Sequence, residues 1–229
     1  MISVKPLSFS AIKEYEQCPY KYYNMKYHAD KYPYKQGAEA ARGERIHKEF
    51  EDYIKYNKPL ETAVQWQSFM TEVGSLDGTK HTEYKMAIDW QANKTAYFKG
   101  KNIWLRGQCD LLVDFGKSAI ILDYKTGKSK YADTGQLKMM SMMAFIHFPK
   151  IEHIEAGLMF VDEDKCISAS YERSQQQEYL DHWFSRSAEI VKSVNNYRAD
   201  IPTRAFPQRN SVLCGWCSVT DCPYYTGEK

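Results

Sequence analysis

The sequence predicts an α/β domain in which helices flank a central mixed β-sheet. Two short apolar runs, residues 111–113 and 119–122, are typical of neighbouring strands, and a tight turn at residues 114–117 joins them through Gly116. Amphipathic stretches with a helical period precede and follow these runs. Because helices and strands alternate along the chain, a sheet covered by helices is the architecture that buries the apolar side of both.

The N-terminal third is expected to be helical. Ser8 or Ser10 can cap a helix that runs to about residue 17. Apolar residues recur every three or four positions over residues 38–56 and again over residues 59–73, which predicts two further helices.

The remaining elements follow from the same reasoning. Alternating or short apolar runs bounded by turn residues predict strands, and a period of 3.6 residues predicts helices. The expected strands are residues 81–90, 103–114, 119–124, 154–161 and 166–171, and the expected helices are residues 133–148 and 174–197. The last two strands are expected to form a hairpin.

Residues 20–35 interleave tyrosines with lysines, and two interpretations stay open. The tyrosine rings could stack on the bases of a nucleic-acid single strand while the lysines contact phosphates. Alternatively, the segment is an amphipathic helix with half-buried tyrosines, because each ring can simply pack. The packed helix is the favoured interpretation.

Composition restricts the class of protein. The 229 residues suit one domain, and a formal net charge of +2 leaves any DNA contact to a local basic patch. No apolar run reaches membrane-spanning length and the first residues show no signal-peptide pattern, so we expect a soluble intracellular protein in a reducing compartment.

The six cysteines are unevenly clustered, which indicates a metal site rather than a secreted disulfide framework. Cys214, Cys217 and Cys222 lie close together near the C-terminal end. Cys109 and Cys166 fall in expected strands and are expected to be ordinary buried thiols.

Two acids and a lysine are expected at neighbouring strand ends. Asp110 lies in the first of the paired strands, and Asp123 ends the second. Lys125 follows two residues later, so its side chain points to the same side as Asp123, while that of Tyr124 points away. Charges are rarely buried unpaired, so this arrangement suits a divalent cation beside a phosphate better than it suits a core.

His47 shares the apolar face of the expected helix 38–56 with Gly43, one turn earlier. A lone histidine in such a place is more often a satisfied core residue than a metal ligand, and the helix alone leaves both interpretations open. Gly43 lowers helix stability and is expected where a backbone or a substrate approaches closely. Glu83, on the polar side of an expected strand, is interpreted as a solvated carboxylate rather than an active-site residue.

Four short patterns occur in a characteristic order. They are G-x-x-x-H at residues 43–47, G-x-x-D at residues 107–110, D-Y-K at residues 123–125, and Gln136 on the following helix. Together they resemble the RecB-type nucleases of the PD-(D/E)XK nuclease superfamily. The resemblance implies a restriction-endonuclease-like core that hydrolyses DNA phosphodiester bonds with Mg²⁺ or Mn²⁺.

The resemblance also implies residue roles. The implied metal ligands are Asp110, Asp123, His47 and the backbone carbonyl of Tyr124. Lys125 would orient or help deprotonate the attacking water, and Gln136 would contact DNA. The family often shows Q-x-x-x-Y on this helix, but Met140 stands here in place of the tyrosine. Candidate phosphate contacts are Lys128, Lys130 and Arg106.

The cysteines resemble those of the iron–sulfur branch of these nucleases, which includes the CRISPR-associated nucleases and the AddB nuclease domain. The matching residues are Cys18, Cys214, Cys217 and Cys222. Thiolates suit a [4Fe–4S] cluster and tetrahedral zinc alike, and the resemblance favours the cluster. The implied organisation is a single RecB-like nuclease domain over residues 1–229, with a core at about 36–172 and cluster-binding segments at about 8–35 and 200–229 that the iron–sulfur clamp joins.

The function that the resemblance implies is a DNA exonuclease in repair, recombination or DNA processing. Its substrate would be single-stranded or end-containing DNA, and its protein partners would act in recombination or replication. No helicase or ATPase motif is present, so any motor would be a partner. Two rivals stay open: a catalytically idle DNA-binding or assembly module with a structural metal–cysteine site, and a zinc-binding structural protein whose acids are incidental.

Overall fold

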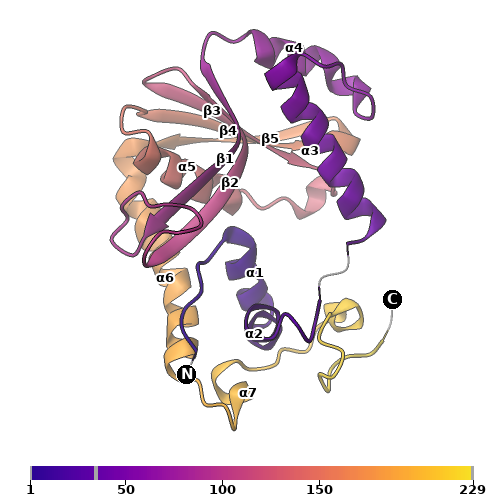
Figure 1. Ribbon diagram of the computed structural model, residues 1–229, viewed down its shortest axis with the longest axis vertical. Helices are drawn as coiled ribbons and strands as arrows, with labels where there is room; N and C mark the ends of the chain where they lie inside the picture. The colour runs from indigo at the N-terminus through magenta and orange to yellow at the C-terminus, as the bar shows by residue number, and fades with distance from the viewer. Residues whose placement is uncertain (1, 34–35, 228–229) are drawn as a thin grey trace. The chain divides into compact units, whose positions relative to one another are not determined.

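The computed structural model describes residues 2–33 and 36–227. The chain divides into two compact units, coloured along the chain in Figure 1. Residues 36–181 form the first, called here the sheet unit. Residues 1–35 and 182–229 form the second, called here the terminal unit.

A five-stranded mixed sheet forms the centre of the sheet unit, as the sequence predicts (Figure 1). In both chain and spatial order, its strands are β1 (Thr79–Asp89), β2 (Ile103–Asp114), β3 (Ser118–Lys125), β4 (His153–Phe160) and β5 (Lys165–Glu172). Only β3 and β4 pair parallel, and β4 and β5 form the expected antiparallel hairpin. The tight turn between β2 and β3 holds Gly116 at a φ of 89°, a conformation that glycine adopts without strain.

Helices cover both faces of this sheet. They are α3 (Ala38–Tyr56), the 3₁₀ turn η1 (Val64–Trp66), α4 (Gln67–Ser75) and α5 (Gly135–His147). Tyr124 packs edge-on against Phe50 of α3, whereas its neighbour Asp123 bonds to Gln136 of α5. Successive strand residues point to opposite faces, so α3 and α5 lie on opposite sides of the sheet.

The helix expected over residues 59–73 is wrong at its N-terminal end, because the first helical turn begins at Val64. The carboxylate of Glu49 accepts hydrogen bonds from the backbone N–H groups of residues 61–63, at 2.9–3.4 Å. A side chain on α3 therefore binds these backbone donors, and the chain stays non-helical there.

The side-chain alternation of β1 and β2 reverses in the middle of both strands. A Cβ on Gly107 would lie 2.8 Å from Met143 and 3.0 Å from Met140, both on α5, whereas Leu111 packs in the cluster against α3 and α4. Residues four apart in a regular strand share a face, so the pleat changes phase between them. Glu83, beside this point on β1, has a left-handed φ of 51° and marks the irregularity.

The terminal unit consists of helices and turns. They are α1 (Phe9–Gln17), α2 (Pro19–Tyr27), the C-terminal part of α6 (Gln176–Asn195), α7 (Pro202–Ala205) and the 3₁₀ turn η5 (Val212–Trp216). Ser8 caps α1 as predicted, and its side chain accepts from the N–H of Ala11 at 3.2 Å. Among the described residues of either unit, no helix is long and apolar enough to cross a membrane.

The described tyrosines of residues 20–35 pack inside the terminal unit. Tyr22 and Tyr23 are buried and stack on the buried ring of Phe206, with centroids 6.5 and 5.0 Å away. The packed interpretation is therefore confirmed for these two rings. The last two positions of the segment, 34–35, lie outside the described residues.

The two strand cysteines differ in exposure. Cys109 is buried as expected, but the expectation for Cys166 is wrong, because this thiol is exposed. Its strand, β5, is an edge strand on which most side chains remain open to solvent.

Candidate functional site

Helix α3 brings His47 to the end of two strands. Its Nε2 lies 3.0 Å from the backbone oxygen of Tyr124, and its Nδ1 lies 3.4 Å from Oδ1 of Asp110. Both ring nitrogens thus face oxygen atoms, and the side chain remains 32% exposed. This environment favours the ligand interpretation of His47 over the core interpretation that the sequence left open.

Strands β2 and β3 separate at Asp110. Their last paired residues are Leu111 and Leu122, and beyond them Oδ2 of Asp110 accepts from the backbone N–H of Tyr124 at 2.7 Å. A carboxylate here replaces the ladder bond that a neighbouring strand would supply. The first of the two predicted acids therefore lies in the fork where the strands diverge.

The second acid, Asp123, forms a triangle with Lys125 and Gln136. The Gln136 amide donates to Oδ1 of Asp123 at 2.5 Å and accepts from the Lys125 ammonium at 2.9 Å. The ammonium also lies 2.5 Å from Oδ2 of Asp123. The structure thus brings these three predicted residues together, with Gln136 placed by the first turn of α5.

Met140, four residues after Gln136, is a core residue. Its side chain is buried against Gly107, and a Cβ added to that glycine would lie 3.0 Å from the Met140 sulfur. The position where the family pattern often has tyrosine thus packs on the sheet. The glycine of G-x-x-D allows this close approach of α5 to β2.

Glu83 belongs to the site, although the sequence favoured a solvated carboxylate. In the part of the chain that the structure describes, His47, Glu83 and Asp110 form a group whose ligand atoms all lie within 4.8 Å of one another. The Glu83 carboxylate also accepts from the side-chain amide of Gln108. The left-handed backbone of Glu83 interrupts the regular strand, and no period in the sequence marks such a residue.

The carboxylates of the site lie in an excess of negative charge. Burial and the charge of Asp110 together raise the pKa of Asp123 to about 6, against the lowering by Lys125. The same two causes raise the pKa of Glu83. Oδ2 of Asp123 is buried, and its contact with Lys125 lacks hydrogen-bond geometry. A divalent cation would offset this charge, and a donor set of carboxylates, imidazole and carbonyl fits Mg²⁺ or Mn²⁺.

A cleft of about 520 Å³ opens beside His47. Helix α3 lines one side, and Glu83, Gln108 and Thr126 line the other. A Cβ on Gly43 would lie 3.2 Å from Oγ1 of Thr126, the residue after β3. A threonine side chain thus approaches Gly43 closely, where the sequence led us to expect a backbone or a substrate.

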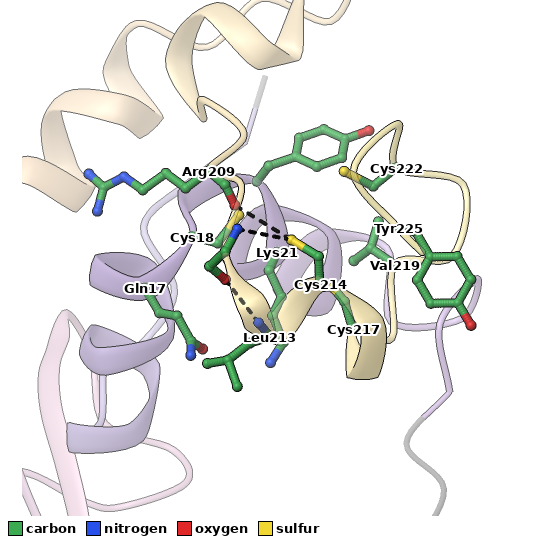
Figure 2. Close-up of a pocket in the computed structure, with 12 residues that line it drawn as sticks. Gln17, Cys18, Lys21, Arg209, Leu213, Cys214, Cys217, Val219, Cys222 and Tyr225 are labelled. Carbon is green, nitrogen blue, oxygen red and sulfur yellow. Dashed lines mark hydrogen bonds between the residues drawn. The ribbon is translucent and has the colours of Figure 1, made fainter. Parts of the chain in front are cut away.

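The four predicted cysteine ligands line a single pocket in the terminal unit (Figure 2). Cys18, Cys214, Cys217 and Cys222 are all half-buried and free of disulfides. No three of their sulfur atoms lie within 4.8 Å of one another in the described chain. Sulfurs bound tetrahedrally to zinc at about 2.3 Å would lie about 3.8 Å apart. The thiol donors suit a metal group, and their spacing is wider than a single zinc ion requires.

Similarity to a known family covers most of the sequence. The profile of the PD-(D/E)XK nuclease superfamily matches residues 6–222. Among solved structures, the one described as "Crystal structure of SSO0001" is similar at 12% sequence identity with a TM-score of 0.46, over 98% of this chain and 89% of that chain. A search of curated protein sequences gave no match.

Proposed function

Since the chain belongs to the PD-(D/E)XK nuclease superfamily, we propose that it is a metal-dependent deoxyribonuclease that hydrolyses DNA from its ends. The observation that carries the proposal is the convergence of His47, Glu83 and Asp110 beside the Asp123–Lys125 pair. End-directed action is supported by the resemblance to RecB-type nucleases. The cellular role would be DNA repair, recombination or DNA processing.

The metal ligands would come from two strand ends and one helix. The residues that would hold Mg²⁺ or Mn²⁺ are Asp110, Asp123, His47 and the Tyr124 carbonyl, with Glu83 beside them. When bound, the cation polarises a phosphate and lowers the pKa of a bound water. The imidazole makes Mn²⁺ a better ligand match than it would be at an all-oxygen site.

Lys125 would hold the attacking water and offset the charge that develops on phosphorus. A hydrogen bond to Gln136 and an ion pair with Asp123 position its ammonium, so it lies beside the acids before any substrate binds. Gln136 therefore contacts both Asp123 and Lys125, in addition to any contact with DNA. This role for Gln136 needs no tyrosine four residues later.

Digestion of end-labelled linear DNA and of circular DNA, each single- and double-stranded, tests the proposal in the presence of Mn²⁺. We expect linear substrates to be degraded and circular ones to resist. Equal rates on both forms would contradict end-directed action. Absence of metal-dependent cleavage would favour the idle DNA-binding module.

We further propose that the four cysteines bind a [4Fe–4S] cluster that clamps the terminal segments of a single nuclease domain, residues 1–229. The resemblance to the iron–sulfur nucleases and the thiols that line one pocket support this assignment. Thiolate ligands require a reducing compartment for assembly. Iron and sulfide analysis should give about four of each per chain. One zinc and no sulfide would refute the cluster.

A further inference from the structure

Tyr97 and Phe98 form an aromatic pair on the connection between β1 and β2. Their rings meet edge-on with centroids 4.8 Å apart. Phe98 is 71% exposed, whereas the tyrosines stacked on Phe206 are buried. An exposed group of apolar side chains that is rimmed by polar residues is typical of a surface that binds a partner.

Two cations flank the pair. The Lys85 ammonium lies 5.2 Å from the ring centre of Phe98, and the Arg106 guanidinium lies 5.6 Å from that of Tyr97. In the described parts of the chain, no carboxylate forms an ion pair with either cation. Both positive charges are therefore available to an anion from outside the protein.

Backbone hydrogen bonds fix the position of this connection. Lys94 forms an antiparallel bridge with Ile88, and the N–H of Thr95 donates to the oxygen of Ala87 at 3.0 Å. The segment thus folds back along β1, the edge strand of the sheet. The aromatic pair consequently has a defined place beside the outer half of β1 and β2.

The aromatic pair and its two cations lie close to a residue that lines the cleft. Lys85 pairs across the strands with Gln108, which lines the cleft and donates to Glu83. Arg106, two residues before Gln108, shares its face of β2. Arg106 lies four positions before Asp110, about 14 Å along a strand at about 3.4 Å per residue. The same length corresponds to about four nucleotides of a stacked strand at about 3.4 Å each.

We propose that Tyr97 and Phe98, flanked by Lys85 and Arg106, form a base-stacking subsite for single-stranded DNA that leads into the cleft. Aromatic faces stack on any base, while the cations bind the phosphates between bases. Base faces are free for such stacking only where the strand is unpaired, so the subsite selects single-stranded DNA or a frayed end. The subsite presupposes the proposed nuclease function, which it sharpens by naming the form of the substrate.

Phe98→Ala tests the subsite, and Tyr56→Ala is its matched control. Tyr56 is also an exposed aromatic of the sheet unit, 63% exposed with the Lys58 ammonium 5.5 Å from its ring centre. It ends α3, beyond Glu51, the last residue of that helix that lines the cleft. Fluorescence anisotropy would measure the binding of two labelled oligonucleotides of about 12 nucleotides, within the usual range of single-strand sites. One is oligo-dT and the other an abasic strand of equal length, both with Ca²⁺ in place of the catalytic metal.

The intact protein and Tyr56→Ala should bind oligo-dT at least about fivefold more tightly than the abasic strand, and Phe98→Ala should lose this preference. Arg106→Gln should weaken both strands about equally, because it removes a phosphate contact and no base contact. A preference that survives in Phe98→Ala, or that is absent from the intact protein, would overturn the subsite.

Cleavage of linear DNA with Mn²⁺, measured on the intact protein, keeps this test separate from that of the proposed function. A protein that prefers bases over abasic sites but never cleaves would refute the nuclease and retain the subsite. A protein that cleaves without any preference for bases would refute the subsite alone.

Discussion

The acid site and the cysteine pocket hold their candidate metal ligands in different ways. At the acid site, His47 contacts the Tyr124 oxygen at 3.0 Å, and Asp123 accepts from Gln136 at 2.5 Å. In the pocket, the Cys214 sulfur has two backbone contacts, at 3.4 and 3.8 Å. Short hydrogen bonds orient the acid ligands, whereas the Cys214 thiol has only longer contacts with the backbone.

This difference predicts different responses to metal loss. The sheet unit should keep its fold without a divalent cation, because strands, helices and hydrogen bonds already place its ligands. The terminal unit should lose stability without the metal group proposed for its cysteines. It should not unfold completely, because Tyr22, Tyr23 and Phe206 give it an aromatic core.

Asp123→Asn should produce the largest change. The amide can still accept from Gln136, but it loses the charge that binds the cation, so cleavage should fall by about 10³-fold, equivalent to about 4 kcal/mol of transition-state stabilisation. The raised pKa of Asp123 means that its ionised form destabilises the metal-free fold above about pH 6. In EDTA at pH 7, the variant should therefore melt no lower than the parent.

Asp114→Asn provides the matched control, because Asp114 ends β2 at the turn before β3. It should cleave normally. An Asp123→Asn protein with undiminished cleavage would remove Asp123 from the site, and one that melts much lower would make its role structural.

Cys18→Ala should have the largest effect on stability. Loss of a cross-link between distant segments typically costs about 2–4 kcal/mol, which should lower the Tm of a chain this size by about 5–15 °C. Differential scanning calorimetry and iron content measure both effects. Cys166→Ala, at an exposed thiol on β5, should change neither. Equal Tm values and equal iron contents of the two variants would contradict the clamp.

His47→Asn should raise the Mn²⁺ concentration needed for half-maximal cleavage by about tenfold or more, by the loss of an imidazole ligand. The comparison residue is His147, a buried histidine whose Nε2 contacts the oxygen of Ala87. His147→Asn should lower the Tm and leave the metal requirement unchanged. The core interpretation of His47 would be restored if the two variants behaved alike.

Glu83→Gln should have the smallest effect, a rise of a few-fold in the Mn²⁺ requirement. The new glutamine can still accept a hydrogen bond from Gln108, and the substitution removes one of the negative charges near Asp110. Titration of cleavage against Mn²⁺ measures the shift. A loss as large as that of Asp123→Asn would make Glu83 an essential ligand instead.

Most of the fold follows from local patterns in the sequence. The strand over 103–114 contains a short apolar run and the helix over 38–56 has a helical period, and both form with the expected bounds. The expected helix over 59–73 begins late because Glu49 bonds to the chain before Val64. That contact depends on tertiary structure, so propensity alone gives no indication of it.

The acids and lysine of the site were predictable because strand ends and a two-residue spacing place them together. Glu83 was not, because its position depends on a left-handed residue inside a strand. The exposure of Cys166 likewise follows from its edge position, which only the order of the strands reveals.

Mn²⁺ binding measured by electron paramagnetic resonance tests directly whether the acid site holds the metal, with the intact protein, Asp110→Asn and Cys217→Ala compared at equal concentration. Bound Mn²⁺ removes signal from the free ion. We expect a Mn²⁺ site in the intact protein, its loss in Asp110→Asn, and its retention in the folded fraction of Cys217→Ala. Retention of the site in Asp110→Asn, or its loss only in Cys217→Ala, would contradict a metal site built on Asp110.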